Sequence, residues 1–440
     1  MFKQYINGKL TEGAGKVMNV YNPATGEVID TVGCADEQQT NDALNAAKAA
    51  FDVWSKTPVN ERADWLLTSL SYYAEEAKRI NGEILPNQGG ADKPVYQLVS
   101  RQPIGVTVGH LAWNYPLGNA SIKLAPAIAS GCTCIIKPSS ETPLATLYLG
   151  VIAEKIGFPA GVLNILSGPS SVVAKTLNES DIPRMLTLIG SYETGLDVMR
   201  QGSSSVKKYS LELGGNAPVI VMGDVDIDEV AANIVAKKVG FAGQTCVNYN
   251  RIYVHESIYE KMCDAVARHL SEVKLGFGKD EGYIMGPVIN MQARDRMLEL
   301  IDDAVAGGAR LVMGGEIPEK FKNGSFITPA LLADVTDDMR VSKEEIFGPI
   351  IPLQPFSDID DAIEKSNNTI FGLSAYFFGH NSSEMSKVIN GVHAGEIFVN
   401  GAAGTEFTPH AGVKQSGIGC DKSKWPMEEY YDFKFVSLNP

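Results

Sequence analysis

The sequence is poor in the residues that hold metal ions and disulfide frameworks. Its 440 residues include only six cysteines and six histidines. The cysteines follow no regular spacing, which is typical of free thiols in a reducing compartment; they stand at positions 34, 132, 134, 246, 263 and 420. The histidines are scattered, and Cys132 and Cys134 flank Thr133 as neighbours on one face of an apolar strand. We therefore expect no metal site.

Excess basic charge and long apolar runs are also missing. Lysine and arginine number 38 against 52 for aspartate and glutamate, so the formal net charge is −14 and the pI is near 5.0. Such a chain repels polyanions, which argues against nucleic acid or an anionic membrane as a partner. No apolar run approaches the roughly 18 residues that span a bilayer, and the first residues have no signal-peptide pattern. We expect a cytoplasmic enzyme of small metabolites.

The order of apolar segments predicts an α/β fold with more than one domain, because a chain of 440 residues is too long for one hydrophobic core. Strands are expected near residues 132–136, 161–166, 185–190 and 208–212, with helices near 143–156, 170–178 and 193–201. This alternation favours βαβ crossovers and a parallel sheet. A second α/β region is expected to have strands near 217–221, 311–313, 350–355 and 396–399, and helices from Asp228 and near 256–272 and 291–306. No Gly-x-Gly-x-x-Gly sequence opens the first helix, so the standard dinucleotide fingerprint is absent.

The first hundred residues have a different pattern. Residues 1–32 predict strands joined by hairpin turns, and residues 36–56 predict a helix. A second helix is expected to begin near Asn60 and to continue through Leu66 and Leu70. Residues 83–102 are expected to form an exposed, extended arm.

The stretch from Glu212 to Cys246 carries an acid and a thiol, with no charge partner close by in the sequence. A free thiol has a pKa of about 8.5, so a nucleophilic cysteine needs a base or a positive local field. Glu212 can be the base if its apolar surroundings raise its pKa by desolvation. Gly214 and Gly215 then allow a sharp turn and close approach to a ligand. A buried structural cysteine and a glutamate in a turn are the alternative interpretations.

Short motifs in a fixed order resemble the aldehyde dehydrogenase superfamily. Leu-Glu-Leu-Gly-Gly at 211–215 and Gly-Gln-Thr-Cys at 243–246 match its catalytic motifs. Further matches are Trp113-Asn114-Tyr115-Pro116, Lys137-Pro138-Ser139, Gly190-Ser191, Glu344-Glu345-Ile346-Phe347-Gly348-Pro349 and Lys414-Gln415-Ser416-Gly417-Ile418-Gly419. Together the matches cover nearly the whole chain. The resemblance implies a Rossmann-like parallel-sheet cofactor domain, a second α/β catalytic domain and a small β oligomerisation arm.

The resemblance also implies where the domains lie. Residues 1–82 and 101–212 are expected to form the NAD(P)-binding domain, 213–421 the catalytic domain, and 83–100 with 422–440 the oligomerisation arm and tail. A homodimer or homotetramer is the expected assembly. Between Arg62 and Pro103 the chain is shorter than a usual member by roughly 35 residues, the size of two or three helices. Loss of packed helices is expected to expose apolar surface of the cofactor domain.

Three catalytic roles follow from the resemblance. Cys246 adds to the aldehyde, Asn114 and the backbone N–H of Cys246 stabilise the oxyanion, and Glu212 activates the water that hydrolyses the later thioester. NADP or NAD accepts the hydride, with Lys137 expected at the adenosine ribose, Gly190 and Ser191 at the pyrophosphate, and Glu345 at the nicotinamide ribose. The complete set of expected cofactor-binding residues is Trp113, Lys137, Ser139, Ser140, Gly190, Ser191, Gly195, Leu213, Glu345 and Phe347. From the residues alone, Asn114 is equally well a turn residue, and an ordinary strand-end charge is the better interpretation of Lys137.

Departures from the family pattern bear on specificity. Ser140 stands where many NAD-preferring members carry a glutamate, so we expect that NADP is accepted. Ile122 and Gly240 stand where succinate-semialdehyde dehydrogenases carry two arginines, which argues against that substrate. The C-terminal motif also departs: Pro409-His410-Ala411-Gly412 stands where most members have Pro-Phe-Gly-Gly, and Cys420-Asp421 stands where they have Arg-Glu. Both departures look more like aminoaldehyde and betaine-aldehyde members, so a small polar aldehyde is the expected substrate. Further candidates for the pocket are Asn119, Thr405 and Glu406.

Other functions remain open at this stage. A coenzyme-A-acylating dehydrogenase would not need the general base that Glu212 supplies. A succinate-semialdehyde-type enzyme with a different carboxylate site is possible. A non-catalytic relic, which lost its cofactor packing with the shortened region, would act as a binding or scaffold protein. Binding of the cofactor, measured as thermal stabilisation, separates the relic from the enzymes.

Overall fold

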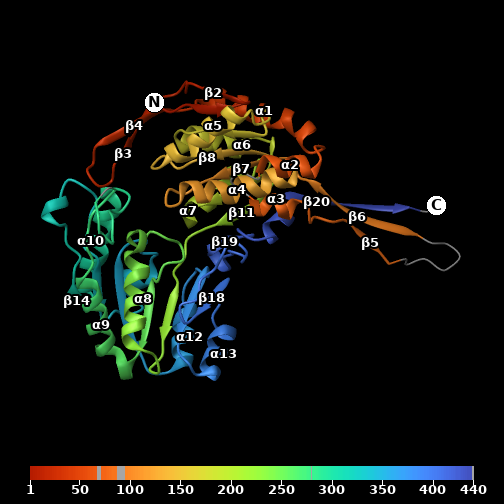
Figure 1. Ribbon diagram of the computed structural model, residues 1–440. Helices are drawn as coiled ribbons and strands as arrows, with labels where there is room; N and C mark the ends of the chain where they lie inside the picture. Colours follow the sequence, from red (N-terminus) through yellow and green to blue (C-terminus); the bar gives the residue numbers. More distant parts are fainter. Residues whose placement is uncertain (67–70, 87–94, 279, 439–440) are drawn as a thin grey trace.

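Two mainly parallel β-sheets, each flanked by helices, form the two lobes of the chain (Figure 1). They are seen in a computed structural model that describes residues 1–66, 71–86, 95–278 and 280–438. The sheet of the first lobe has eight strands and that of the second lobe has seven. The α/β prediction is therefore confirmed.

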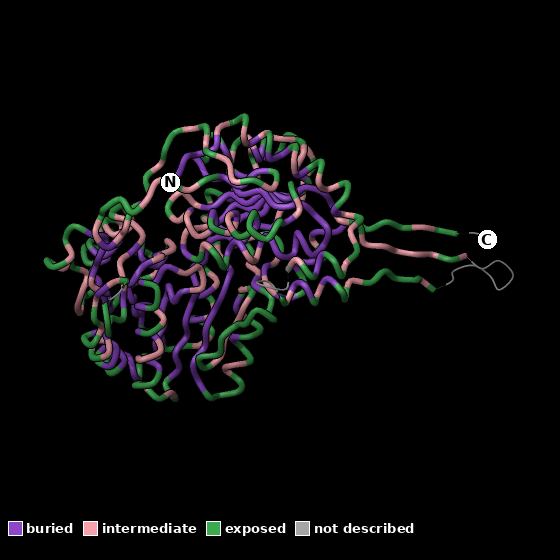
Figure 2. The backbone as a smooth tube through the Cα atoms, turned by 45° about the horizontal axis from the view of Figure 1, so that its top comes forward, coloured by how far each residue is buried: buried purple, intermediate pink, exposed green. Residues whose placement is uncertain are grey.

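The first lobe is built on a sheet in the order β19-β11-β10-β7-β8-β9-β1-β2. Its five central strands, from β11 to β9, run parallel and are largely buried, as the apolar runs predicted (Figure 2). β7 was not expected from the sequence, because Thr107, Gly109 and His110 interrupt its apolar run. The strands are β1 (Gln4–Ile6), β2 (Lys9–Thr11), β7 (Val106–His110), β8 (Thr133–Lys137), β9 (Leu163–Ile165), β10 (Pro183–Ile189), β11 (Lys208–Glu212) and β19 (Gly417–Ile418). A separate hairpin pairs β3 (Val17–Tyr21) with β4 (Val28–Gly33).

Helices cover both faces of this sheet (Figure 1). They are α1 (Glu37–Trp54), α2 (Val59–Leu66), α3 (Ser71–Ala77), α4 (Pro116–Ser130), α5 (Pro143–Ile156), α6 (Lys175–Glu179) and α7 (Tyr192–Gly202). The predicted helix over 170–178 is a π-helical turn, Ser170–Ala174, followed by α6. The predicted continuation of α2 to Leu70 lies outside the described residues. The sequence analysis missed α4, which starts with Pro116 and holds Pro126.

The two sides of the shortened region meet in the core of the first lobe. Ala63 of α2 and Ala74 of α3 are fully buried, and Tyr73 is 7% exposed. All three belong to one hydrophobic cluster with Leu124 and Ile128 of α4. The helices that remain therefore cover α4, and the apolar surface expected to be exposed here is covered at these positions.

The second lobe is built on a sheet in the order β14-β15-β16-β13-β12-β17-β18, in which only β14 is antiparallel to its neighbour. The strands are β12 (Pro218–Val221), β13 (Arg251–His255), β14 (Arg310–Met313), β15 (Ala330–Ala333), β16 (Ile350–Phe356), β17 (Ser374–Phe378) and β18 (Glu396–Val399). The helices are α8 (Ile227–Val239), α9 (Tyr259–Ser271), α10 (Met291–Ala306), α11 (Arg340–Lys343), α12 (Ile359–Asn367) and α13 (Ser382–Gly391). No described helix, in either lobe, has both the length and the apolarity of a membrane span.

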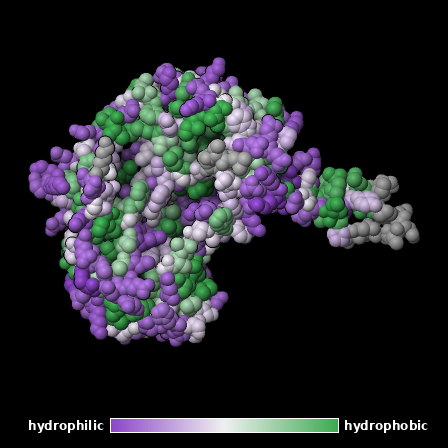
Figure 3. All heavy atoms as spheres, in the orientation of Figure 1, coloured by the Kyte–Doolittle hydropathy of each residue, from purple (hydrophilic) through white to green (hydrophobic). Residues whose placement is uncertain are grey.

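A three-stranded arm projects from the first lobe (Figure 1). It consists of β5 (Glu83–Leu85), β6 (Tyr96–Pro103) and β20 (Tyr431–Leu438), paired antiparallel in the order β20-β6-β5. Its large apolar side chains lie open to solvent: Ile84 is 76% exposed, Phe433 64% and Phe435 57% (Figure 3). A surface of this kind is typical of a protein interface. Assembly through the arm stays a prediction.

Residues 409–421, which we call the linking segment, join the lobes. The segment contributes β19, which pairs antiparallel with β11. The hydroxyl of Ser416 donates a hydrogen bond to the carbonyl of Gly214 at 2.8 Å. Asp421 forms a buried ion pair with Lys123 of α4, with Nζ 2.7 Å from Oδ1. A piece of the predicted catalytic domain is thus part of the first sheet, and the domain limits themselves stay predictions.

Candidate active site

A cleft of 2080 Å³ lies between the two lobes. The carboxyl ends of β7, β8, β10 and β11 form one wall, and residues from α8, the loop after it and the loop after α11 form the other. All the predicted catalytic and cofactor-binding residues line it except Gly195. Gly195 is buried behind the wall, where an added Cβ would lie 2.8 Å from the side chain of Leu213. Gly195 of α7 thus lets the side chain of Leu213 approach closely, and its role at the cofactor stays a prediction.

The thiol of Cys246 is placed by a strained loop at the end of α8. Phe241 and Ala242 have φ angles of 54° and 51°, in the left-handed region that non-glycine residues seldom adopt. Gly243 follows with φ 74°, and a Cβ there would lie 2.3 Å from the carbonyl oxygen of Gly348. Only glycine fits this approach. Strained backbone of this kind is concentrated at functional sites, where the surrounding structure holds it in place.

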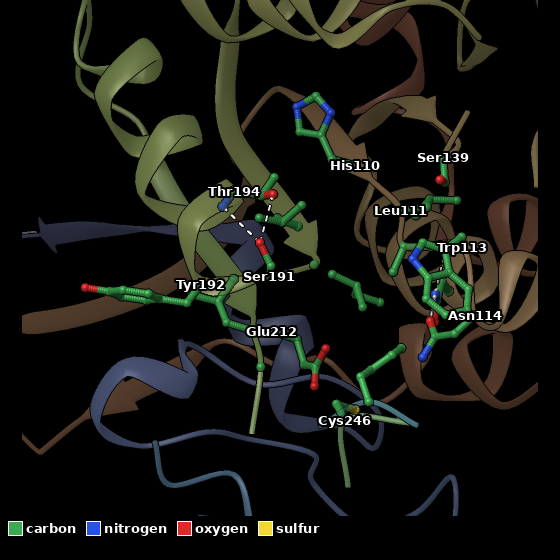
Figure 4. Close-up of a pocket in the computed structure, with 18 of the residues that line it drawn as sticks. His110, Leu111, Trp113, Asn114, Ser139, Ser191, Tyr192, Thr194, Glu212 and Cys246 are labelled. Carbon is green, nitrogen blue, oxygen red and sulfur yellow. Dashed lines mark hydrogen bonds between the residues drawn. The ribbon is translucent and has the colours of Figure 1, made fainter. Parts of the chain in front are cut away.

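Glu212 and Cys246 point toward each other across the cleft floor (Figure 4). Between them lies His410 of the linking segment, with Nε2 3.2 Å from Oε1 of Glu212 and 3.8 Å from Sγ of Cys246. The other ring nitrogen, Nδ1, is 2.9 Å from Oε1 of Glu396 at the start of β18. The ligand atoms of Glu212, Cys246 and His410 all lie within 4.8 Å of one another, a spacing that would also suit a metal ion.

The charges in this cluster depend on one another. Burial raises the pKa of Cys246 to about 12, and the carboxylate of Glu212 contributes to the rise, whereas His410 lowers it. Burial alone would lower the pKa of His410. Its contacts with Cys246, Glu212 and Glu396 outweigh burial and raise that pKa well above the usual 6.5. These three contacts therefore favour the protonated form of the imidazole beside the thiol.

His410 is the main site residue that the sequence analysis missed. It noted the Pro409-His410-Ala411-Gly412 departure only as a sign of substrate class. Glu396 gave no signal, because a glutamate that opens a strand has no motif around it. Since His410 lies 164 residues after Cys246, only the fold brings the two together.

Asn114 lies in the loop before α4 with its side-chain amide held in one orientation. Its Oδ1 accepts hydrogen bonds from the backbone N–H of Tyr115 at 3.2 Å and from Nδ2 of Asn119 at 3.3 Å. Its Nδ2 donates to the carbonyl of Gln244, in the loop that carries Cys246, at 3.2 Å. The amide N–H groups therefore face the nucleophile loop. Of the further candidates, Asn119 lines the cleft, whereas Thr405 and Glu406 are exposed outside its lining.

One end of the cleft suits an anionic ligand. Lys137 ends β8, and burial lowers the pKa of its ammonium group to about 8. Ser191 caps the N-terminus of α7, where its Oγ accepts from the backbone N–H of Thr194 at 3.3 Å (Figure 4). Helix N-termini attract phosphate groups because the free N–H groups and the helix dipole favour negative charge. His110 also lines this end and is neutral, since burial lowers its pKa to about 4.

Glu345, which follows α11, also lines the cleft. Its Oε1 accepts a hydrogen bond from the backbone N–H of Gly215 at 3.0 Å, and desolvation raises its pKa to about 8. An added Cβ on Gly214 would lie 2.6 Å from Oε2 of Glu345, so this approach requires glycine. Next to it, the rings of Trp113 and Phe347 meet edge to face at 5.3 Å. The carboxyl group and the aromatic pair thus face the cleft together.

The thiol end of the cleft is lined by two lysines that the sequence analysis did not single out. They are Lys237 of α8 and Lys422, directly after the linking segment. Lys237 feels the charges of Cys246, Glu396 and Lys422. Neither ammonium group forms an ion pair with a carboxylate of the described residues, although that of Lys237 lies over the rings of Tyr249 and Tyr376, 5.8 and 5.4 Å from their centroids. Ile122 and Gly240 line the same end, as expected of positions that could contact a substrate.

Comparison with known proteins places this geometry in a wider context. The sequence model of the aldehyde dehydrogenase family matches residues 10–71 and 66–436. The NADP(+)-dependent succinate-semialdehyde dehydrogenase of Escherichia coli is 36% identical, with 100% of this chain and 98% of the relative covered. The 3-sulfolactaldehyde dehydrogenase of Pseudomonas putida is also 36% identical, with coverage of 99% and 96%. The crystal structure of an NADP-dependent enzyme from E. coli superposes with a TM-score of 0.95 at 35% identity, over 100% of this chain and 98% of that one.

These comparisons agree with the shortening between Arg62 and Pro103. The family match is divided into two stretches, which overlap at residues 66–71. The alignment with the E. coli succinate-semialdehyde dehydrogenase extends over 478 positions, whereas this chain has 440 residues. The relative therefore has residues without a counterpart here.

Proposed function

Since the chain belongs to the aldehyde dehydrogenase family and is an NAD(P)-dependent aldehyde dehydrogenase, we propose that it oxidises a small polar aldehyde to the carboxylic acid through a covalent intermediate on Cys246. One observation carries this proposal. A thiol, a carboxylate and an oriented amide from three separate elements converge on one end of the cleft, at Cys246, Glu212 and Asn114.

The chain's own groups define the steps. Cys246 gives its proton to Glu212 as its sulfur forms a bond to the aldehyde carbon, and the oxygen that becomes negative is stabilised by Nδ2 of Asn114 and the backbone N–H of Cys246. Loss of hydride from the resulting thiohemiacetal leaves a thioester. Glu212, once it has released its proton to solvent, takes a proton from water, which attacks the thioester carbon. The C–S bond then breaks and the acid leaves.

The residues of the cleft fit a nicotinamide dinucleotide, which supplies the acceptor for the hydride when bound. Lys137 would bind the adenosine ribose, the N-terminus of α7 at Ser191 the pyrophosphate, and Glu345 the nicotinamide ribose. The buried ammonium group of Lys137 suits the ribose, and the capped end of α7 suits the pyrophosphate. The carboxyl group of Glu345, which Gly214 can approach because it has no Cβ, suits the nicotinamide ribose. Ser140 lines the cleft beside Lys137 without a carboxylate, so a 2′-phosphate is tolerated there.

Replacing Ser140 with glutamate is expected to move the preference from NADP to NAD. A carboxylate at this position repels the 2′-phosphate and removes a charge-assisted hydrogen bond worth about 1.5–3 kcal/mol, so kcat/KM for NADP relative to NAD falls roughly 10-fold to 100-fold. Initial rates with both cofactors measure the ratio. Ser140→Ala is the matched control: it removes the donor without adding charge and lowers the ratio less. An unchanged ratio in Ser140→Glu would contradict the assignment.

The lysines at the thiol end favour an aldehyde with an acidic group over one with an amine. Ile122 and Gly240 stand where succinate-semialdehyde dehydrogenases carry two arginines. Lys237 and Lys422 supply positive charge from other positions in the same cleft. The relatives named above act on succinate semialdehyde and 3-sulfolactaldehyde, and both of these carry an acidic group. This observation favours the alternative of a semialdehyde enzyme with a different carboxylate site.

A panel of aldehydes tests both the activity and this preference. We expect kcat/KM for succinate semialdehyde to exceed that for 4-aminobutyraldehyde, and Lys237→Met to lower the first value about tenfold or more, because a charged hydrogen bond is lost. Lactaldehyde and propanal, which lack both charges, report the background rate. Lys261→Met, an exposed lysine of α9, is the control. A preference for 4-aminobutyraldehyde would overturn the anionic assignment, and no turnover with any aldehyde by folded protein would favour the relic.

A further inference from the structure

We propose that His410 is a catalytic residue of this enzyme: held as a cation by Glu396, it supplies the positive charge that stabilises the thiolate of Cys246. The proposal rests on the proposed role of Cys246 as the nucleophile, and it deepens that role. His410 touches a reacting atom, since its Nε2 lies 3.8 Å from Sγ of Cys246. Glu396 does not touch the thiol and is a positioning residue.

The geometry leaves the imidazole few other roles. His410 is 9% exposed, and both ring nitrogens face groups that accept hydrogen bonds. Nδ1 meets Glu396 at 2.9 Å, while Nε2 faces Glu212 at 3.2 Å and the thiol at 3.8 Å. A neutral imidazole donates from only one nitrogen, whereas the cation donates from both. Two carboxylates on opposite sides of the ring thus select the charged form.

The backbone fixes the ring in this place. The N–H of His410 donates to the carbonyl of Asp421 at 2.8 Å, and the N–H of Asp421 donates back to the carbonyl of His410 at 2.7 Å. The side chain of Asp421 is anchored in turn by its ion pair with Lys123. The imidazole is therefore positioned from both lobes: by Glu396 on β18 and by the pairing of Asp421 with Lys123 on α4.

The positive charge of His410 favours ionisation of the Cys246 thiol, which the rest of the site disfavours. A buried thiol beside the carboxylate of Glu212 resists ionisation, because both burial and the negative neighbour favour the neutral form. The imidazolium beside the thiol stabilises the thiolate in two steps: when the thiolate attacks the aldehyde, and when it leaves the thioester. In each step the proton moves between Cys246, Glu212 and water. His410 keeps its own proton throughout.

Other titratable groups act on the ring or on its neighbours. On its own segment these are Cys420 and Asp421, on β11 it is Glu212, on β18 it is Glu396, and on the nucleophile loop it is Cys246. Lys237 of α8 also acts on Cys246 and Glu396. Substituting only the ring therefore isolates its contribution from theirs.

The test is the pH dependence of alkylation of Cys246 by iodoacetamide, in the absence of aldehyde and nucleotide. The product is quantified at Cys246 by peptide mass spectrometry, because Cys420 is also partly exposed. A chelator is present throughout, since the cluster could also hold a metal ion. The variants are His410→Asn, which is neutral but forms hydrogen bonds, His410→Phe, which has the residue usual in the family, and Glu396→Gln. His393→Phe, on an exposed histidine, is the control.

We expect both His410 variants to move the rising part of the pH–rate profile of alkylation to higher pH by about one to three units, so that the alkylation rate at pH 7 falls about 10-fold to 1000-fold. The sign follows from the charge: removing a cation disfavours the thiolate, and a higher pH is needed to form it. Glu396→Gln moves the profile the same way by less. A wild-type profile in any of the three variants, each shown to be folded by thermal unfolding, would overturn the proposal. A displaced profile in an enzyme that turns over no aldehyde would support it while the proposed function failed.

Discussion

Cys246→Ala is expected to abolish aldehyde-dependent formation of NADPH or NADH, with a loss in kcat on the order of 10⁴-fold or more, as when an enzyme loses its nucleophile. The thiohemiacetal cannot form without the sulfur, and a free aldehyde is a poor hydride donor. The initial rate with succinate semialdehyde, followed at 340 nm, measures the loss. Binding of NADP should persist, because the residues proposed to bind it, Lys137, Ser191 and Glu345, are left unchanged.

Cys420→Ala is the matched control for this experiment. Cys420 is the other partly exposed cysteine near the site, and its thiol donates a hydrogen bond only to the carbonyl of Asp421 at 3.2 Å. We expect that its removal leaves turnover nearly intact. If Cys246→Ala retained turnover while Cys420→Ala lost it, the nucleophile would be Cys420 and the proposed site would be wrong.

Glu212→Gln is expected to separate the two halves of the reaction. Glutamine has the same shape and still accepts a hydrogen bond from His410, but it cannot take a proton from water, so hydrolysis of the thioester slows by about 10²-fold to 10⁴-fold. Formation of the thioester is affected less, because the cation at His410 still favours the thiolate. Stopped-flow measurements should show a burst of close to one NADPH per site, followed by a slow steady state.

Two observations decide this second prediction. Glu364→Gln, on an exposed glutamate of α12, should show neither the burst nor the slow phase. The burst of Glu212→Gln should be the same with and without coenzyme A, because the first turnover does not need it. A variant that loses the burst together with the steady state would show that Glu212 is needed most when it takes the proton of Cys246, and the prediction that hydrolysis is the step most slowed would then be wrong.

Much of the fold could be predicted because burial leaves a direct trace in the sequence. The apolar runs at residues 132–136 and 208–212 correspond to β8 and β11, since strands covered on both faces are apolar throughout. β7 was missed because Thr107 and His110 are polar, yet they are buried in partnerships with Thr133 and Asn178 that lie far along the chain. α4 was missed because its internal Pro126 is a residue that usually ends a helix.

Some residues of the site could also be predicted from the sequence, and others could not. Glu212, Cys246 and Asn114 stand within recognisable motifs, and the structure brings them to one cleft. The electrostatic environment of the thiol could not be predicted, because it depends on His410 and Glu396, which share no local pattern with Cys246. Lys237 and Lys422 were missed for the same reason: a lysine gives no sign in the sequence of whether it faces solvent or a cleft.

The linking segment limits how this protein can be recombined with its relatives. In the chain it follows the second lobe. In the fold it adds strand β19 to the first sheet and forms a buried ion pair with α4. A chimaera that joined the first lobe of one enzyme to the second lobe of another at Glu212 would divide Lys123 from Asp421 and Glu212 from His410. The two lobes are therefore not interchangeable modules. Residues 409–421 would have to be exchanged together with α4 and β11, even though they lie some two to three hundred positions later in the gene product.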